Sequence, residues 1–166
     1  MGSVRYVMVA SSSSEQGELN KQLVRQFFEL LDHHNTDRIG QLFVSNNNYS
    51  FRIEGMPPVD WNEHKRLLAT IINAFPDLHH EIEDFVTEGD KVAVRLTVTG
   101  THKGEFRGIP PTGKKLYLDE MGSITITDGK ITEGWISADS MRLMHQIGVT
   151  LQPSSYSDTT SNNASQ

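Results

Sequence analysis

The chain has 166 residues, 36% of them hydrophobic and 22% charged, so it can bury a sizeable core and fits one domain better than two. Fifteen basic and twenty-one acidic side chains give a net charge of −6, which disfavours nucleic acid and anionic membranes as partners. The lack of cysteine excludes disulfides and thiolate chemistry, and no stretch reaches the roughly 20 apolar residues of a membrane-spanning helix. We therefore expect a soluble globular protein with a cytoplasmic location.

Both ends of the chain are predicted to be disordered. Residues 1–17 contain a run of four serines, and residues 152–166 are almost wholly polar, so neither segment can offset the entropy lost on ordering. The apolar run near the start is too short for the core of a signal peptide. The predicted domain therefore spans residues 18–151.

The sequence pattern of the first half of this domain predicts three helices and one strand. Apolar residues recur at three- and four-residue spacing over residues 23–31, which is typical of an amphipathic helix, and Thr36 is expected to cap a short second helix. Residues 49–53 alternate as a strand does. Asp60 begins a third helix with a capping-box pattern, and Pro76 ends it.

From Leu78 the hydrophobic period changes to two, which predicts a meander of antiparallel strands. One face of the first strand is assigned to Leu78, His80, Ile82, Asp84 and Val86. Further strands are predicted over residues 92–99, 116–127 and 131–137, and Gly148 is expected to end a closing helix. Helices followed by a meander predict an α+β fold, with a curved antiparallel sheet wrapped around the N-terminal helices.

Five motifs stand in order along the domain. They are Phe75-Pro76-Asp77-Leu78, Glu88-Gly89-Asp90-Lys91-Val92-Ala93, Gly100-Thr101-His102-Lys103-Gly104-Glu105-Phe106, Gly108-Ile109-Pro110-Pro111-Thr112-Gly113 and Asp128-Gly129-Lys130-Ile131. This string closely resembles the SnoaL-like polyketide cyclases, also called ester cyclases. The resemblance implies a cone of the nuclear transport factor 2-like type around an apolar pocket, a homodimer, and acid/base chemistry without a cofactor on a hydrophobic metabolite of polyketide or terpenoid type.

The resemblance also marks two departures from the family. In its ring-closing enzymes, an acid/base Asp is expected at the position of Ile136 and a partner His at the position of Gly122. Two hypotheses therefore stay open. One is an enzyme of secondary metabolism that catalyses cyclisation, isomerisation or dehydration. The other is a non-catalytic small-molecule-binding or dimerisation module that has lost the acid/base pair.

Three residues are candidates for the catalytic role. Asp139 follows the last strand, where it could exchange protons with a ligand or cap the closing helix. Glu120 shares strand parity with Gly122, and the resemblance implies that this face turns toward the pocket, whereas a slipped register would turn Glu120 to solvent. His102 could transfer protons or brace its loop.

Residues predicted to contact the ligand are Ile136, Gly134, Trp135, His80 and Tyr49. Trp135 also suits the core or a dimer interface, and an open strand face with Arg95, Thr97 and Thr99 is expected to pair two copies. Because adjacent strand residues point to opposite faces, His79 and His80 are not expected to bind a metal together, and no metal or cofactor is predicted.

Overall fold

The computed structural model describes residues 13–44 and 49–150, so most of both predicted tails lies outside the described residues. The first helix, α1, spans Ser13–Asp32 and therefore begins within the segment predicted as a disordered arm. The hairpin formed by residues 79–101 contacts this first part of the helix. A methyl group on Gly17 would lie 3.0 Å from the Thr87 hydroxyl oxygen, and the Asn20 side chain donates a hydrogen bond to the Gly89 carbonyl at 3.4 Å.

The remaining elements follow the predicted order. They are α2 (Thr36–Gly40), β1 (Ser50–Ile53), α3 (Trp61–Ala74), β2 (His79–Glu88), β3 (Lys91–Thr101), β4 (Lys115–Thr127), β5 (Lys130–Ala138) and α4 (Ser140–Ile147). Asp60 caps α3 as predicted by accepting a hydrogen bond from the backbone N–H of Glu63 at 2.8 Å. Gly148 ends α4 in the left-handed conformation, with φ of 104°.

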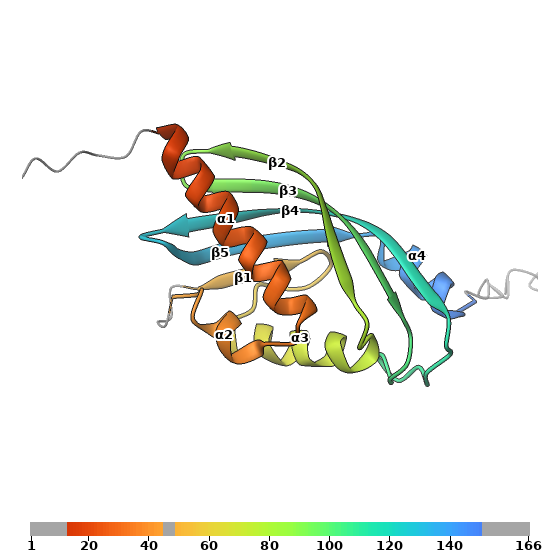
Figure 1. Ribbon diagram of the computed structural model, residues 1–166. Helices are drawn as coiled ribbons and strands as arrows, with labels where there is room; N and C mark the ends of the chain where they lie inside the picture. The colour runs from red at the N-terminus through yellow and green to blue at the C-terminus, as the bar shows by residue number, and fades with distance from the viewer. Residues whose placement is uncertain (1–12, 45–48, 151–166) are drawn as a thin grey trace, which may run out of the picture.

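The five strands form one mixed sheet in the order β1-β5-β4-β3-β2. Every neighbouring pair is antiparallel except β1 and β5, which run parallel. The sheet bends around α1 and α3, and α4 lies at its far end (Figure 1). The buried, even-numbered residues of β3, such as Val94 and Leu96, face the helices. The α+β class and the curved sheet on helices are therefore confirmed, and the parallel β1–β5 pair is the exception to the predicted antiparallel order.

Two local predictions are wrong. The register of β2 against β3 shifts between Ile82 and Asp84, so the inward position passes to Phe85, and Val86 is 64% exposed. A bulge inserts one residue and reverses the alternation beyond it, which simple parity cannot anticipate. The cap of α2 is Asn35 and not Thr36, because the Asn35 side chain accepts the backbone N–H of Arg38 at 3.2 Å.

The strand face expected to be open is only partly so. Arg95 is exposed, but Thr97 is buried and donates its hydroxyl to the Glu83 carboxylate at 2.8 Å. Within the two described ranges, no helix has both the length and the apolar character needed to cross a membrane. The cytoplasmic location stays a prediction.

Candidate active site

A cavity of about 260 Å³ lies between the concave face of the sheet and the helices. Most of its wall is apolar, and residues from all five strands and from α1, α3 and α4 contribute to it. Its polar lining side chains are His64, Thr70, His80, Arg107, Glu120 and Ser140. A dry cavity of about 150 Å³ in another protein holds one benzene ring. The larger cavity here therefore has room for more than a single ring.

The end of α1 and the start of β2 bring a carboxylate and an imidazole together at this cavity. His80 Nδ1 lies 2.6 Å from Asp32 Oδ1, and the His80 backbone N–H also donates to this carboxylate. Burial alone would raise the pKa of Asp32, but hydrogen bonds from the His80 side chain and backbone, the His80 charge and a hydrogen bond from His79 together lower it. Because an ionised carboxylate only accepts, His80 Nδ1 donates to Asp32, and in the neutral ring Nε2 is then the acceptor.

The other ring nitrogen of His80 is available to a ligand. The His80 side chain is only 5% exposed, lines the cavity and packs against the Phe28 ring at a centroid distance of 5.2 Å. Within the described part of the chain, His80 Nε2 has no hydrogen-bond partner, and the atom is not fully buried. It therefore retains accessible surface, and a ligand in the cavity can reach it.

Glu120 contributes a second ionisable group from the middle of the sheet. It stands on the buried parity of β4, next to Leu118, and pairs with Leu96 on β3 and Ala138 on β5. Burial raises the pKa of Glu120, and the nearby His80 partly opposes that rise. A carboxyl group with a raised pKa keeps its proton to a higher pH than an exposed one, which suits it to act as a proton donor.

A buried pair on the other edge of the sheet joins Tyr49 to His64. The Tyr49 hydroxyl lies 2.5 Å from His64 Nδ1, and the imidazole stacks on the Phe51 ring at a centroid distance of 4.1 Å and an angle of 11°. Burial raises the pKa of the Tyr49 phenol and lowers the pKa of His64 to about 4. Both groups are therefore neutral at physiological pH, and His64 lines the cavity.

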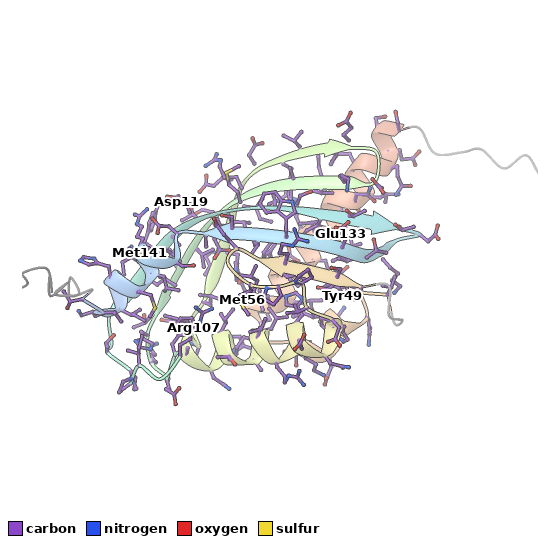
Figure 2. All side chains as sticks on the ribbon, turned by 180° about the vertical axis from the view of Figure 1, so that it is seen from behind. Tyr49, Met56, Arg107, Asp119, Glu133 and Met141 are labelled. Atoms are coloured by element: carbon purple, nitrogen blue, oxygen red, sulfur yellow. The ribbon has the colours of Figure 1, made fainter. Side chains whose placement is uncertain are left out.

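Arg107 and Met56 lie on two loops at the cavity wall. The Arg107 guanidinium contacts the Met56 sulfur at 3.9 Å and lies 5.4 Å from the centroid of the Phe106 ring. Tyr49 and Arg107 lie toward opposite ends of α3, with Met56 between them (Figure 2). The cavity thus has a cationic side chain at one end and the Tyr49–His64 pair at the other.

Comparison with known proteins assigns this fold and cavity to a family. Residues 21–147 match the family description "SnoaL-like polyketide cyclase". The chain belongs to the SnoaL-like polyketide cyclase family. No curated protein gives a significant match.

Solved structures share this fold. AclR from Streptomyces galilaeus, a proposed hydroxylase, is 28% identical with a TM-score of 0.72, covering 82% of this chain and 98% of its own. A proposed SnoaL-like polyketide cyclase from Jannaschia sp. CCS1 is 21% identical with a TM-score of 0.75, covering 86% and 100%. IdmH from Streptomyces antibioticus, a proposed polyketide cyclase, is 24% identical with a TM-score of 0.68, covering 78% and 99%.

The two positions at which the sequence resemblance predicts a departure from the family face each other. Gly122 on β4 pairs with Ile136 on β5, and Ile136 lines the cavity. A Cβ on Gly122 would lie 2.7 Å from the Trp135 carbonyl oxygen and 3.2 Å from Ile136 Cγ1. The ionisable groups that line this cavity stand elsewhere, on α3, β2, β4 and the loop that carries Arg107.

The predicted ligand-contacting residues divide into two groups. His80 and Ile136 line the cavity, and Tyr49 lies behind the cavity wall, bonded to His64. Gly134 is covered by the Phe51 ring, because a Cβ there would lie 2.7 Å from a ring carbon. Trp135 is 47% exposed and has no place in the cavity wall.

The structure separates the three predicted catalytic residues. Glu120 lines the cavity, whereas Asp139 is exposed and caps α4 by accepting the Arg142 backbone N–H at 2.9 Å. His102 is fully buried outside the cavity wall, with Nδ1 3.0 Å from the Thr112 hydroxyl and Nε2 without a partner among the described residues. His102 therefore braces its loop, and Asp139 caps the closing helix.

Sequence reasoning missed Asp32, His64 and Arg107. Asp32 follows Phe28 by four residues and His64 precedes Leu68 by four, so both continue an apolar helix face. A polar residue on such a face is a signal that could have marked both. His79 and His80 do share a partner, since His79 Nδ1 lies 2.8 Å from Asp32 Oδ2, although no group of three or more metal-binding side chains gathers within residues 13–44 and 49–150.

Proposed function

We propose that this protein is an acid/base enzyme that binds a hydrophobic, oxygenated metabolite of polyketide or terpenoid type and catalyses its cyclisation, isomerisation or dehydration without a cofactor. The observation that carries this proposal is the convergence of His80, held by Asp32, and Glu120 on one apolar cavity. Titratable groups that meet in a largely apolar pocket are a recognised mark of a catalytic site.

In the proposed reaction, His80 Nε2 removes a proton from a carbon next to a ligand carbonyl. The C–H bond breaks, an N–H bond forms, and the electron pair moves to the carbonyl oxygen as an enolate. Asp32 holds the imidazole in the required tautomer and stabilises the imidazolium. Protonated Glu120 then donates its proton, either to the enolate carbon or to the alkoxide oxygen that forms when this carbon attacks a second carbonyl and closes a ring. The His80 imidazolium afterwards loses its proton to solvent and Glu120 regains one.

Carbon-acid exchange tests this proposal without knowledge of the natural substrate. The probe is 2-tetralone, an apolar bicyclic ketone with acidic C–H bonds next to the carbonyl. In D2O at neutral pD, we expect the protein to accelerate deuterium uptake well above the rate in buffer alone, as followed by mass spectrometry. Calorimetry on the same samples measures whether the ketone binds.

The alternative is a non-catalytic small-molecule-binding module, and the residues at the family's acid/base positions favour it. Ile136 and Gly122 cannot exchange protons, and the cavity would still enclose a hydrophobic ligand. Binding of 2-tetralone without any acceleration of its exchange is the result that would replace the enzyme proposal with this one.

We also propose that two copies of the chain pair through the outer face of the sheet. Tyr117 and Met121 on β4 and Trp135 on β5 share the parity that faces away from the helices, and they are 50%, 58% and 47% exposed. Figure 2 shows β4 and β5 in front of α1, and the labels of Asp119 on β4 and Glu133 on β5 mark where this outer face lies. Large apolar side chains gathered on one face are typical of protein interfaces.

Sedimentation tests this pairing. At micromolar concentration we expect a species of twice the monomer mass of 18.6 kDa. Met121→Glu should shift it to the monomer because it places a charge in the centre of the interface. Met141→Glu is the matched control, since Met141 is 65% exposed but lies on α4. A wild-type protein that sediments only as a monomer contradicts the proposal.

A further inference from the structure

The tautomer of His64 is fixed by its buried neighbour. Tyr49 is 5% exposed, and its hydroxyl has His64 Nδ1 as its one hydrogen-bond partner among the described residues. If Nδ1 carried the proton, the phenolic O–H would be left without an acceptor in a buried site, at a cost of about 1–3 kcal/mol. The phenol therefore donates to Nδ1, and the neutral imidazole carries its proton on Nε2.

This Nε2–H donor has no acceptor among the described residues. His64 is 2% exposed and lines the cavity. Its Nε2 has no hydrogen-bond partner in the described ranges, and this atom is not fully buried. It therefore reaches accessible surface at the cavity. The stack on Phe51 and the bond to Tyr49 fix the direction of the ring.

The position of His64 complements that of His80. His64 lies against β1, and His80 stands on β2, so the two imidazoles reach the cavity from opposite edges of the sheet. Their tautomers give them opposite roles, because Asp32 leaves His80 Nε2 as an acceptor and Tyr49 leaves His64 Nε2 as a donor. A donor that stays neutral can bond a carbonyl oxygen and keep that bond when the oxygen becomes an enolate.

We propose that His64 Nε2–H binds the carbonyl oxygen of the ligand while an acidic C–H next to that carbonyl faces His80. Tyr49 is the positioning residue that holds His64 in the donor tautomer. The inference rests on the proposed acid/base function for its catalytic meaning, but carbonyl binding at His64 can be measured apart from any turnover.

The first test reads the tautomer directly in the wild-type protein. With ¹⁵N-labelled histidine at pH 7, NMR is expected to show His64 as neutral, with the proton on Nε2. In Tyr49→Phe the phenolic donor is gone, so the Nδ1–H form should become populated. A charged His64, or a wild-type proton on Nδ1, overturns the proposal whether or not any variant folds.

The second test measures recognition of the carbonyl. The affinities for 2-tetralone and for tetralin, which lacks the oxygen, are compared by calorimetry. In His64→Phe, which keeps an aromatic ring on Phe51, the preference for the ketone should fall about tenfold, since one net hydrogen bond is lost. The double variant Tyr49→Phe/His64→Phe removes the stranded phenol O–H and should show the same loss. A preference unchanged in both, or lost only in Arg107→Gln, overturns the proposal.

These outcomes separate this inference from the proposed function. His80→Gln should slow the accelerated deuterium exchange on the order of 100-fold, whereas the loss of ketone preference is expected in His64→Phe. A ketone preference that depends on His64 in a protein that accelerates no exchange would leave the carbonyl site standing and refute the enzyme proposal. Accelerated exchange without that preference would do the reverse.

Discussion

Replacing His80 with Gln is expected to slow the exchange of 2-tetralone on the order of 100-fold, because a positioned general base contributes at least that factor. Asp32→Asn should lower the rate by a smaller factor. Its amide can still accept the His80 backbone N–H, but it no longer stabilises the imidazolium that forms on proton transfer. Mass spectrometry of deuterium uptake at saturating ketone measures both effects.

The neighbouring histidine supplies a matched control. His79 also bonds Asp32, at 2.8 Å, but its side chain is 65% exposed and it has no place in the cavity wall. His79→Gln thus removes an imidazole from the same carboxylate without changing the group that faces the ligand. We expect its exchange rate to stay within about twofold of wild type. Equal losses in the His79 and His80 variants would mean that the carboxylate supports the fold and that neither ring acts on the ligand.

Local patterns were sufficient to predict most of the fold. The apolar spacing in α1 and α3 and the alternation in β3 and β4 identified these elements, since both periods follow directly from backbone geometry. The same alternation placed Glu120 on the face of β4 that carries Gly122, the family resemblance turned that face inward, and Glu120 lines the cavity. The bulge in β2 and the parallel β1–β5 pair were missed, because each depends on how one strand meets another and not on its own period.

The candidate site was harder to predict, for a related reason. Asp32 and His80 are 48 residues apart in the sequence and meet only because the end of α1 lies against the first residues of β2. Tyr49 and His64 likewise meet through the packing of α3 on β1. Neither pair has a sequence motif, so residue spacing cannot reveal the contact. Asp139, by contrast, lay next to a predicted helix, and its capping contact was one of the two roles weighed from the sequence.

Ile136→Asp is expected to destabilise the fold strongly at neutral pH and much less at acidic pH. Ile136 lines the apolar cavity at the position where the family resemblance places an acid/base Asp. Burial would raise the pKa of the introduced carboxyl above its unfolded value near 3.9. His80 and Arg107, which also line the cavity, would oppose that rise when charged, whereas His64 stays neutral.

The sign of the pH effect follows from proton linkage. Because the folded state binds the proton more tightly, the electrostatic penalty is complete above the raised folded pKa and disappears below the unfolded pKa, where both states are protonated. A rise of about two units would cost about 2.7 kcal/mol at pH 7. Ile136→Asn is the matched control, since it buries a polar group of the same size that does not titrate. Urea denaturation at pH 7 and near pH 4 should therefore show the Asp variant much less stable than the Asn variant at pH 7 and close to it at pH 4. A difference between the two variants that is the same at both pH values would mean that residue 136 meets water, and the enclosed cavity on which the acid/base proposal depends would have to be abandoned.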